Sequence, residues 1–130
     1  ENRTMPYELT TIPFENYLHV KVRGQNNTAT VSAYLLDVAR LCRKHNYSAV
    51  LIEEHLSGPS LSMADIFNII RNRSSDAWFL SHIAYVDINV DHDFGQMKFA
   101  EMVALNEGVQ VRMFQDLNAA QQWLEQPLKS

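Results

Sequence analysis

The sequence predicts an α/β domain in which helices pack on a mostly parallel sheet of four or five strands. The apolar run Ala-Val-Leu-Ile at residues 49–52 is too short for a helix and stands between two amphipathic helical segments. Such a run fits a central strand that is covered on both faces. Strands that alternate with helical segments of ten or more residues form βαβ units, and their strands run parallel.

Composition indicates one ordinary globular domain. The chain has 130 residues, of which 46% are apolar, and a formal net charge of −4. An acidic balance argues against a nucleic-acid surface, which usually carries an excess of basic residues. Cys42 is the single cysteine, so an internal disulfide is excluded. No apolar stretch approaches the length of about 18 to 20 residues that spans a membrane, and no signal-peptide pattern opens the chain, so we expect a cytoplasmic protein.

The first third of the chain predicts a tail or edge strand, then a second strand and a helix. Residues 1–16 form a tail or an edge strand over 5–10, because Pro6 and Pro13 disfavour an inner position. Residues 17–24 alternate apolar and polar side chains, which predicts a strand with one wet face. Thr30 is expected to cap a helix that ends near Asn46, a residue suited to a left-handed turn. The buried stripe of that helix is Val31, Leu35, Val38, Ala39 and Cys42.

After the central strand, residues 55–61 predict a loop and Ser62 an N-cap. The inward stripe of the following helix is expected at Met63, Ile66, Phe67 and Ile70. The polar segment 72–76 should end this helix, and Ser75 should begin a short second piece that carries three apolar residues, Trp78, Phe79 and Leu80.

The last third predicts two more strands and two more helices. The nearly continuous apolar segment 83–88 fits a second inner strand. Asp91 is expected to cap the next helix, and Gly108 to follow its end. The inward side of that helix is Met97, Ala100, Val103 and Ala104. The alternating segment 109–113 predicts a strand, and Asp116 a cap for a final helix that ends at Pro127. The inward face of the final helix is Leu117, Ala120, Trp123 and Leu124.

This order of elements, with the closing segments, resembles the STAS domains and in particular their SpoIIAA-like branch. The match is carried by Phe-Ala-Glu at 99–101, by Glu-Gly-Val-Gln-Val-Arg-Met-Phe at 107–114 and by Ala-Gln-Gln-Trp-Leu at 120–124. The resemblance covers residues 17–124 and places a SpoIIAA-like domain at 17–126. It implies a layered sheet with an antiparallel edge strand, and it also indicates a bacterial protein.

The resemblance implies a regulatory, non-enzymatic function. STAS domains of the anti-anti-sigma type bind proteins and carry a phosphorylatable serine where the helix after the central strand begins. Ser57, Ser60 and Ser62 occupy that region here, although Leu-Ser-Gly-Pro at 56–59 replaces the family's Asp before a serine pair followed by Gly-Leu. The resemblance therefore predicts a protein partner and allows a homodimer. Helix N-termini also favour phosphate, but Ser62 needs no role beyond capping.

The second hypothesis is a site for a small apolar or lipid-like ligand, because the SpoIIAA-like branch also resembles the CRAL-TRIO lipid-binding fold. The expected pocket residues are Glu54, His55, Phe67, Trp78 and Phe79. The two glutamates at 53 and 54 should mark where the central strand leaves the core, at the sheet edge where α/β proteins bind ligands. The aromatic pair can equally cap one end of the core.

An enzyme with an acidic site is the third hypothesis. One of the carboxylates at 53 and 54 can form an acid–base pair with His55, but Glu53 and Glu54 should point to opposite faces of the strand. No complete catalytic set emerges from the spacing. The acidic segment 87–93 departs from the EF-hand pattern, with His92 at position six and Lys98 at position twelve. We therefore predict neither a metal site nor a cofactor.

Overall fold

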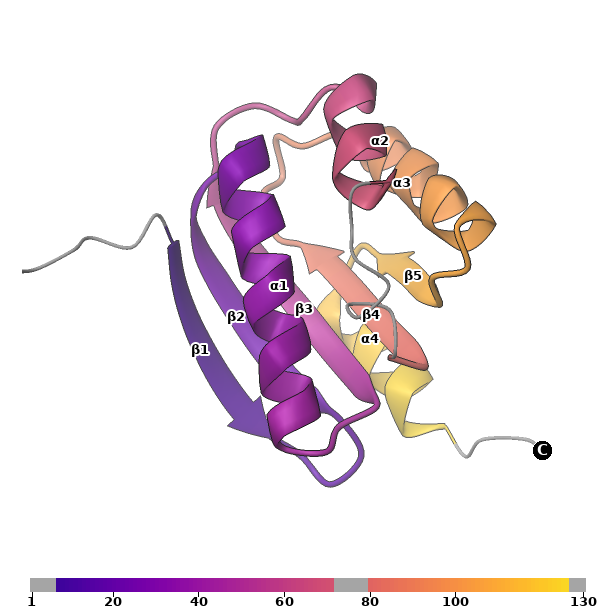
Figure 1. Cartoon of the computed structure of the whole chain (residues 1–130). Helices are drawn as coiled ribbons and strands as arrows, with labels where there is room; N and C mark the ends of the chain where they lie inside the picture. Colours follow the sequence, from indigo (N-terminus) through magenta and orange to yellow (C-terminus); the bar gives the residue numbers. More distant parts are fainter. Residues whose placement is uncertain (1–6, 72–79, 127–130) are drawn as a thin grey trace, which may run out of the picture.

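The computed structural model describes residues 7–71 and 80–126 (Figure 1). Within these residues five strands and four helices follow one another. The strands are β1 (Tyr7–Pro13), β2 (Leu18–Gln25), β3 (Ala49–Ser57), β4 (His82–Asp87) and β5 (Val111–Phe114). The helices are α1 (Thr28–Lys44), α2 (Met63–Arg71), α3 (Phe94–Asn106) and α4 (Leu117–Glu125).

The sheet has the order β1-β2-β3-β4-β5, with β3 at its centre. Strand β1 pairs antiparallel with β2 at the edge, and the other neighbours pair parallel. The predicted α/β class, the parallel inner sheet and the antiparallel edge strand are confirmed. Pro13 is the last residue of β1, where the missing N–H costs no inner ladder bond.

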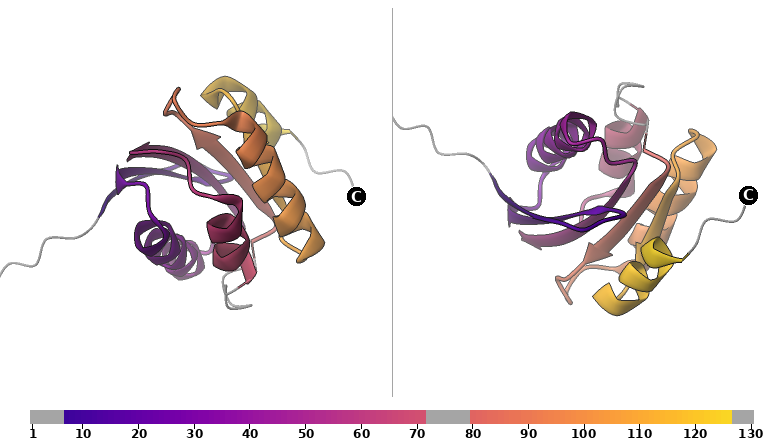
Figure 2. Two further views of the ribbon diagram at one scale, coloured as in Figure 1. Left: turned by 90° about the horizontal axis from the view of Figure 1, so that it is seen from above. Right: turned by 90° about the horizontal axis from the view of Figure 1, so that it is seen from below.

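The two faces of the sheet have separate apolar cores. Helices α1 and α3 pack on one face with α2 between them, and α4 packs on the other (Figure 2). Alternate residues of β3 serve the two cores: Val50 and Ile52 face α1, whereas Leu51 faces α4. No described helix has the length and apolar character needed to cross a membrane.

The predicted bounds of the central strand are wrong. Strand β3 continues through His55 to Ser57, so the loop begins at Gly58. Glu53 and Glu54 lie inside the strand and are 5% and 3% exposed. They do not mark an exit from the core, because each carboxylate has hydrogen-bond partners that make its burial tolerable.

The polar face of β2 is also more covered than its alternation predicts. His19 is 5% exposed, because its ring lies against Phe14 and contacts Glu53. Periodicity reports which side chains share a face, but not whether that face meets water.

Two helix caps differ from the prediction. Asn27, not Thr30, caps α1: its Oδ1 accepts a hydrogen bond from the Thr30 N–H at 2.8 Å. Asp93, not Asp91, caps α3 through the Gly95 N–H at 2.8 Å. The predicted caps Ser62 and Asp116 are confirmed by bonds from the third residue beyond each. The left-handed turns predicted at two helix ends are present, at Asn46 (φ +63°) and Gly108 (φ +86°).

The predicted inward stripe of α2 is partly wrong. Ile66 and Ile70 pack against the core, but Met63 and Phe67 are 52% and 41% exposed. Ile69 is buried in their place, because α2 is rotated so that its three isoleucines face inward. The segment 72–79, with its predicted break, Ser75, Trp78 and Phe79, lies outside the described residues, as does Pro127.

Candidate functional site

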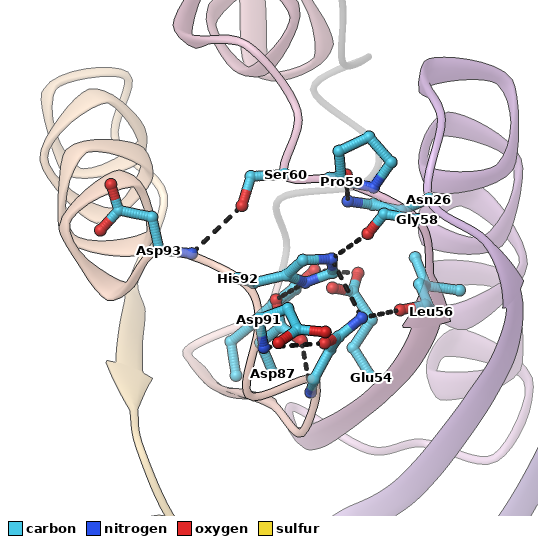
Figure 3. Close-up of polar contacts among 12 residues, drawn as sticks. Asn26, Glu54, Leu56, Gly58, Pro59, Ser60, Asp87, Asp91, His92 and Asp93 are labelled. Carbon is cyan, nitrogen blue, oxygen red and sulfur yellow. Dashed lines mark hydrogen bonds and ion pairs between the residues drawn. The ribbon is translucent and has the colours of Figure 1, made fainter.

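Three loops meet at the carboxyl edge of the parallel strands. They follow β2, β3 and β4, and in sheets of this type ligands bind at such an edge. Asn26 Nδ2 donates to the Pro59 carbonyl at 2.8 Å, and Ser60 Oγ accepts from the Asp93 N–H at 3.1 Å (Figure 3). His92 Nε2 lies 2.7 Å from the Gly58 carbonyl. We call this set of contacts the loop clasp; it holds the β3–α2 loop in place.

His92 is the centre of the loop clasp. Its Nδ1 lies 2.6 Å from an Asp87 carboxylate oxygen, while its Nε2 meets the Gly58 carbonyl. Asn89 Nδ2 also lies 3.3 Å from His92 Nε2, but the two nearer partners are both acceptors, so the arrangement suits an imidazolium that donates to Asp87 and to Gly58. Burial alone would lower the pKa of His92, but the bonds to Gly58 and Asp87 outweigh it and raise the pKa above 6.5.

The three predicted serines lie along one loop but differ in their surroundings. Ser57 is exposed at the end of β3. Ser60 belongs to the loop clasp, and Ser62 Oγ accepts the Asp65 N–H at 3.0 Å as the cap of α2. Phosphate on Ser60 or Ser62 would disturb these bonds. Ser57 caps no helix, so phosphate there would disturb neither bond.

Glu54 anchors a buried polar group beneath the loop clasp. The hydroxyls of Tyr34 on α1 and Tyr85 on β4 both donate to Glu54 Oε2, and the two hydroxyl oxygens are 2.8 Å apart. Burial raises the pKa of Glu54 to about 7 from 4.5, against the opposing effect of the tyrosine bonds. Glu54 therefore exchanges a proton near neutral pH.

Glu54 and Tyr85 lie at one end of a cavity of about 130 Å³ between the sheet and the three helices α1, α2 and α3. Its walls are almost entirely apolar over most of its length. The side chains come from all three helices and from β3, β4 and β5, and include Val31, Leu35, Ile52, Ile66, Ile69, Ile83, Met97, Ala104, Val111 and Met113. Its polar end is formed by Glu54, Tyr85, Asp87, His92 and Gln96 with the loop residues beside them.

Only part of the predicted ligand pocket lies at this cavity. Glu54 lines it, but Phe67 lies on the outer side of α2. His55 points to the opposite face of the sheet, where its Nε2 is 2.5 Å from Glu53. Trp78 and Phe79 lie outside the described residues. The pocket is therefore deeper and more central than the sequence predicts.

Glu53 forms a second buried cluster, on the α4 side of the sheet. It lies between two histidines, with His19 Nε2 at 2.7 Å and His55 Nε2 at 2.5 Å. Burial alone would raise the pKa of Glu53, but the contacts with His55 and His19 outweigh it and hold the pKa below 4.5. The predicted divergence of Glu53 and Glu54 is present. Within the described residues, no cluster of His, Cys, Asp and Glu has the geometry of a metal site.

Tyr34, Tyr85, His92 and Gln96 are site residues that the sequence analysis did not identify. A signal exists for Tyr34, since it is three residues after Val31 and four before Val38 on the buried stripe of α1. Tyr85 stands in an apolar strand and gives no sign of its polar partner. The roles of His92 and Gln96 depend on where the β4–α3 loop meets the sheet, which spacing does not report.

No protein-family model and no curated protein matches the chain. Among solved structures, the fold is similar to that of an anti-sigma factor antagonist from Mycobacterium paratuberculosis. The TM-score is 0.53 at 10% sequence identity, and the match covers 92% of this chain and 95% of the other. The SpoIIAA-like fold that the closing sequence segments indicate is therefore confirmed.

Proposed function

We propose that this chain is a non-enzymatic regulatory domain that binds a protein partner through the β3–α2 loop and the outer side of α2. The observation that carries the proposal is the exposure of Met63 and Phe67, 52% and 41%, directly after a serine-bearing loop. Residues four apart lie on one side of a helix. Large apolar side chains exposed together are typical of contact surfaces.

The loop clasp supports this proposal because it holds the loop in one arrangement before a partner arrives. A preorganised surface loses less entropy on binding than a mobile one. The fold of an anti-sigma factor antagonist agrees with a regulatory role. Ser57 is the best position for a phosphate switch, since it is exposed and caps no helix. A phosphate would add about −1.5 to −2 charges beside the proposed contact surface.

The test is affinity capture from the source cell extract, followed by a binding measurement with the purified partner. We expect the variant with both Met63→Asp and Phe67→Asp to weaken binding at least tenfold, because two charges replace the apolar contact. Gln122→Asp on α4 is the matched control: it adds a charge to an exposed helix position on the other face of the sheet and should bind like the wild type.

Ser57→Asp tests the phosphate switch separately. We expect it to weaken partner binding, whereas Ser57→Ala should retain it. Equal affinity of the double α2 variant and the wild type would contradict the proposed surface. Equal affinity of the two Ser57 variants would contradict the switch alone.

A further inference from the structure

The cavity beneath α2 has the size and lining of a small-molecule site. Protein interiors are close-packed, and voids larger than a water molecule are few. An engineered apolar cavity of about 150 Å³ in another protein binds benzene, so one ring fits a void of this kind. At about 130 Å³ the present cavity is of similar size and accepts a compact molecule. A long acyl chain is too large to be enclosed in a space of this volume.

The polar end of the cavity contains one buried acceptor that receives no hydrogen bond from the part of the chain that the structure describes. Gln96 Oε1 is buried there and has no hydrogen-bond partner among the described residues. A buried acceptor without a donor is costly, and a ligand that brings one recovers that cost. Glu54 and Asp87 add further acceptor oxygens at the same end.

The charges at this end also select against anions. Asp87 lines it and already engages His92, the one cationic group among the described cavity-lining residues, and Glu54 adds a second negative charge when it loses its proton. A fatty-acid carboxylate would therefore meet like charge in a buried setting. A cation would lose its hydration in a mainly apolar space. A neutral hydroxyl or N–H group meets neither penalty.

We propose that this cavity binds a small, neutral, compact apolar molecule, of about one ring, whose single hydroxyl or N–H group donates to Gln96 Oε1 at the polar end. The site is distinct from the protein-binding surface proposed above, which uses the outer side of α2. The inner side of α2 covers the ligand through Ile66 and Ile69. Either proposal can fail without the other.

Phenol and toluene are the probes, because they are nearly equal in size and only phenol carries a donor. Titration calorimetry, with ligand-observed NMR for weak binding, gives the phenol-to-toluene affinity ratio. We expect both probes to bind the wild type, and Gln96→Leu to lower the ratio roughly five- to tenfold, the value of one hydrogen bond. Comparing the phenol-to-toluene ratio of the wild type with that of Gln96→Leu cancels the difference in hydrophobicity between the probes.

Ala104→Leu tests the cavity itself. Ala104 lines the cavity, so the larger leucine side chain should fill it and weaken the binding of both probes at least tenfold. Met102→Leu, on the exposed side of the same helix, should bind like the wild type. Circular dichroism verifies folding, and Ala100→Val replaces the filling variant if Ala104→Leu does not fold.

Three results would overturn the proposal. The first is that neither probe binds the wild type. The second is that the phenol-to-toluene ratio is unchanged by Gln96→Leu, which would leave a purely apolar void. The third is that palmitate binds while the one-ring probes do not, which would assign the space to a lipid.

Discussion

At the scale of single residues, Glu54 belongs both to the buried core and to the candidate site. A carboxyl group that is 3% exposed is tolerated because Tyr34 and Tyr85 donate to it. Its pKa of about 7 means that folding favours the protonated form. The same group forms part of the polar end of the cavity, so its protonation state alters the acceptors that a ligand meets.

This pKa predicts how stability depends on pH. Between pH 4.5 and about 7 the folded state binds more protons at Glu54 than the unfolded state, so stability falls as pH rises. The loss attributable to Glu54 between pH 5 and pH 8 is roughly 2 to 3 kcal/mol. His92 acts in the same direction, because the stability from its raised pKa is lost as pH rises through that pKa. Tyr34, Tyr85 and Asp87 are the other ionisable groups facing Glu54.

Urea denaturation at pH 5 and pH 8 measures this dependence. Glu54→Gln keeps the shape and an acceptor oxygen but cannot titrate, so the difference between the two pH values should become smaller. An undiminished difference in Glu54→Gln would assign the pH dependence to another group.

At the scale of the elements, helix starts are determined by single side-chain bonds. The sequence predicts Asp91 as the cap of α3, and Asp93 lies only two residues further along the chain. In the structure Asp93 has extended backbone angles and its Oδ1 accepts the Gly95 N–H, so it is the cap. Asp91 is exposed.

The two aspartates therefore make a matched pair of variants. Asp93→Ala should lower the free energy of unfolding by about 1 kcal/mol, because an N–H at the start of α3 loses its acceptor. Asp91→Ala should lie within about 0.5 kcal/mol of the wild type, as exposed substitutions usually do. Chemical denaturation compares them directly, and a larger loss for Asp91→Ala would contradict the cap assignment.

At the scale of the whole molecule, the two faces of the sheet are packed differently. The α4 face is built around residues such as Leu51 and Ala84, both 0% exposed. The other face contains the cavity. Adding volume should therefore have opposite effects on the two faces.

Two alanine-to-leucine variants test this asymmetry. Ala104→Leu should raise the melting temperature, with a gain of about 0.5 to 2 kcal/mol from filling the cavity. Ala84→Leu should lower stability by about 1 to 3 kcal/mol, since Ala84 is fully buried against the α4-side core and the added carbons must displace its neighbours. Differential scanning calorimetry distinguishes the two. A lower melting temperature for both variants would mean that the cavity closes when the chain is in solution.

The fold could be predicted from the sequence because its signals are local. Periods of two and of about 3.6 residues indicate strands and helices, and the unbroken run at 49–52 indicates the central strand. Alternation of the two then implies a parallel sheet, and prolines near the start imply an edge strand. Each inference uses residues within a few positions of one another, so no knowledge of packing is needed.

The candidate site depended on tertiary structure. Glu54 meets Tyr34 and Tyr85 across sequence separations of 20 and 31 residues, and His92 meets Gly58 across 34. These contacts follow from strand register, which places Ile52 beside Tyr85, and from the rotation of each helix on the sheet. A period identifies which residues share a side but not what that side faces, which is why Phe67 was predicted inside and lies outside. Local patterns in the chain therefore specify the elements and their order, whereas the cavity, the loop clasp and the buried carboxyl groups arise from packing between elements that are distant in sequence.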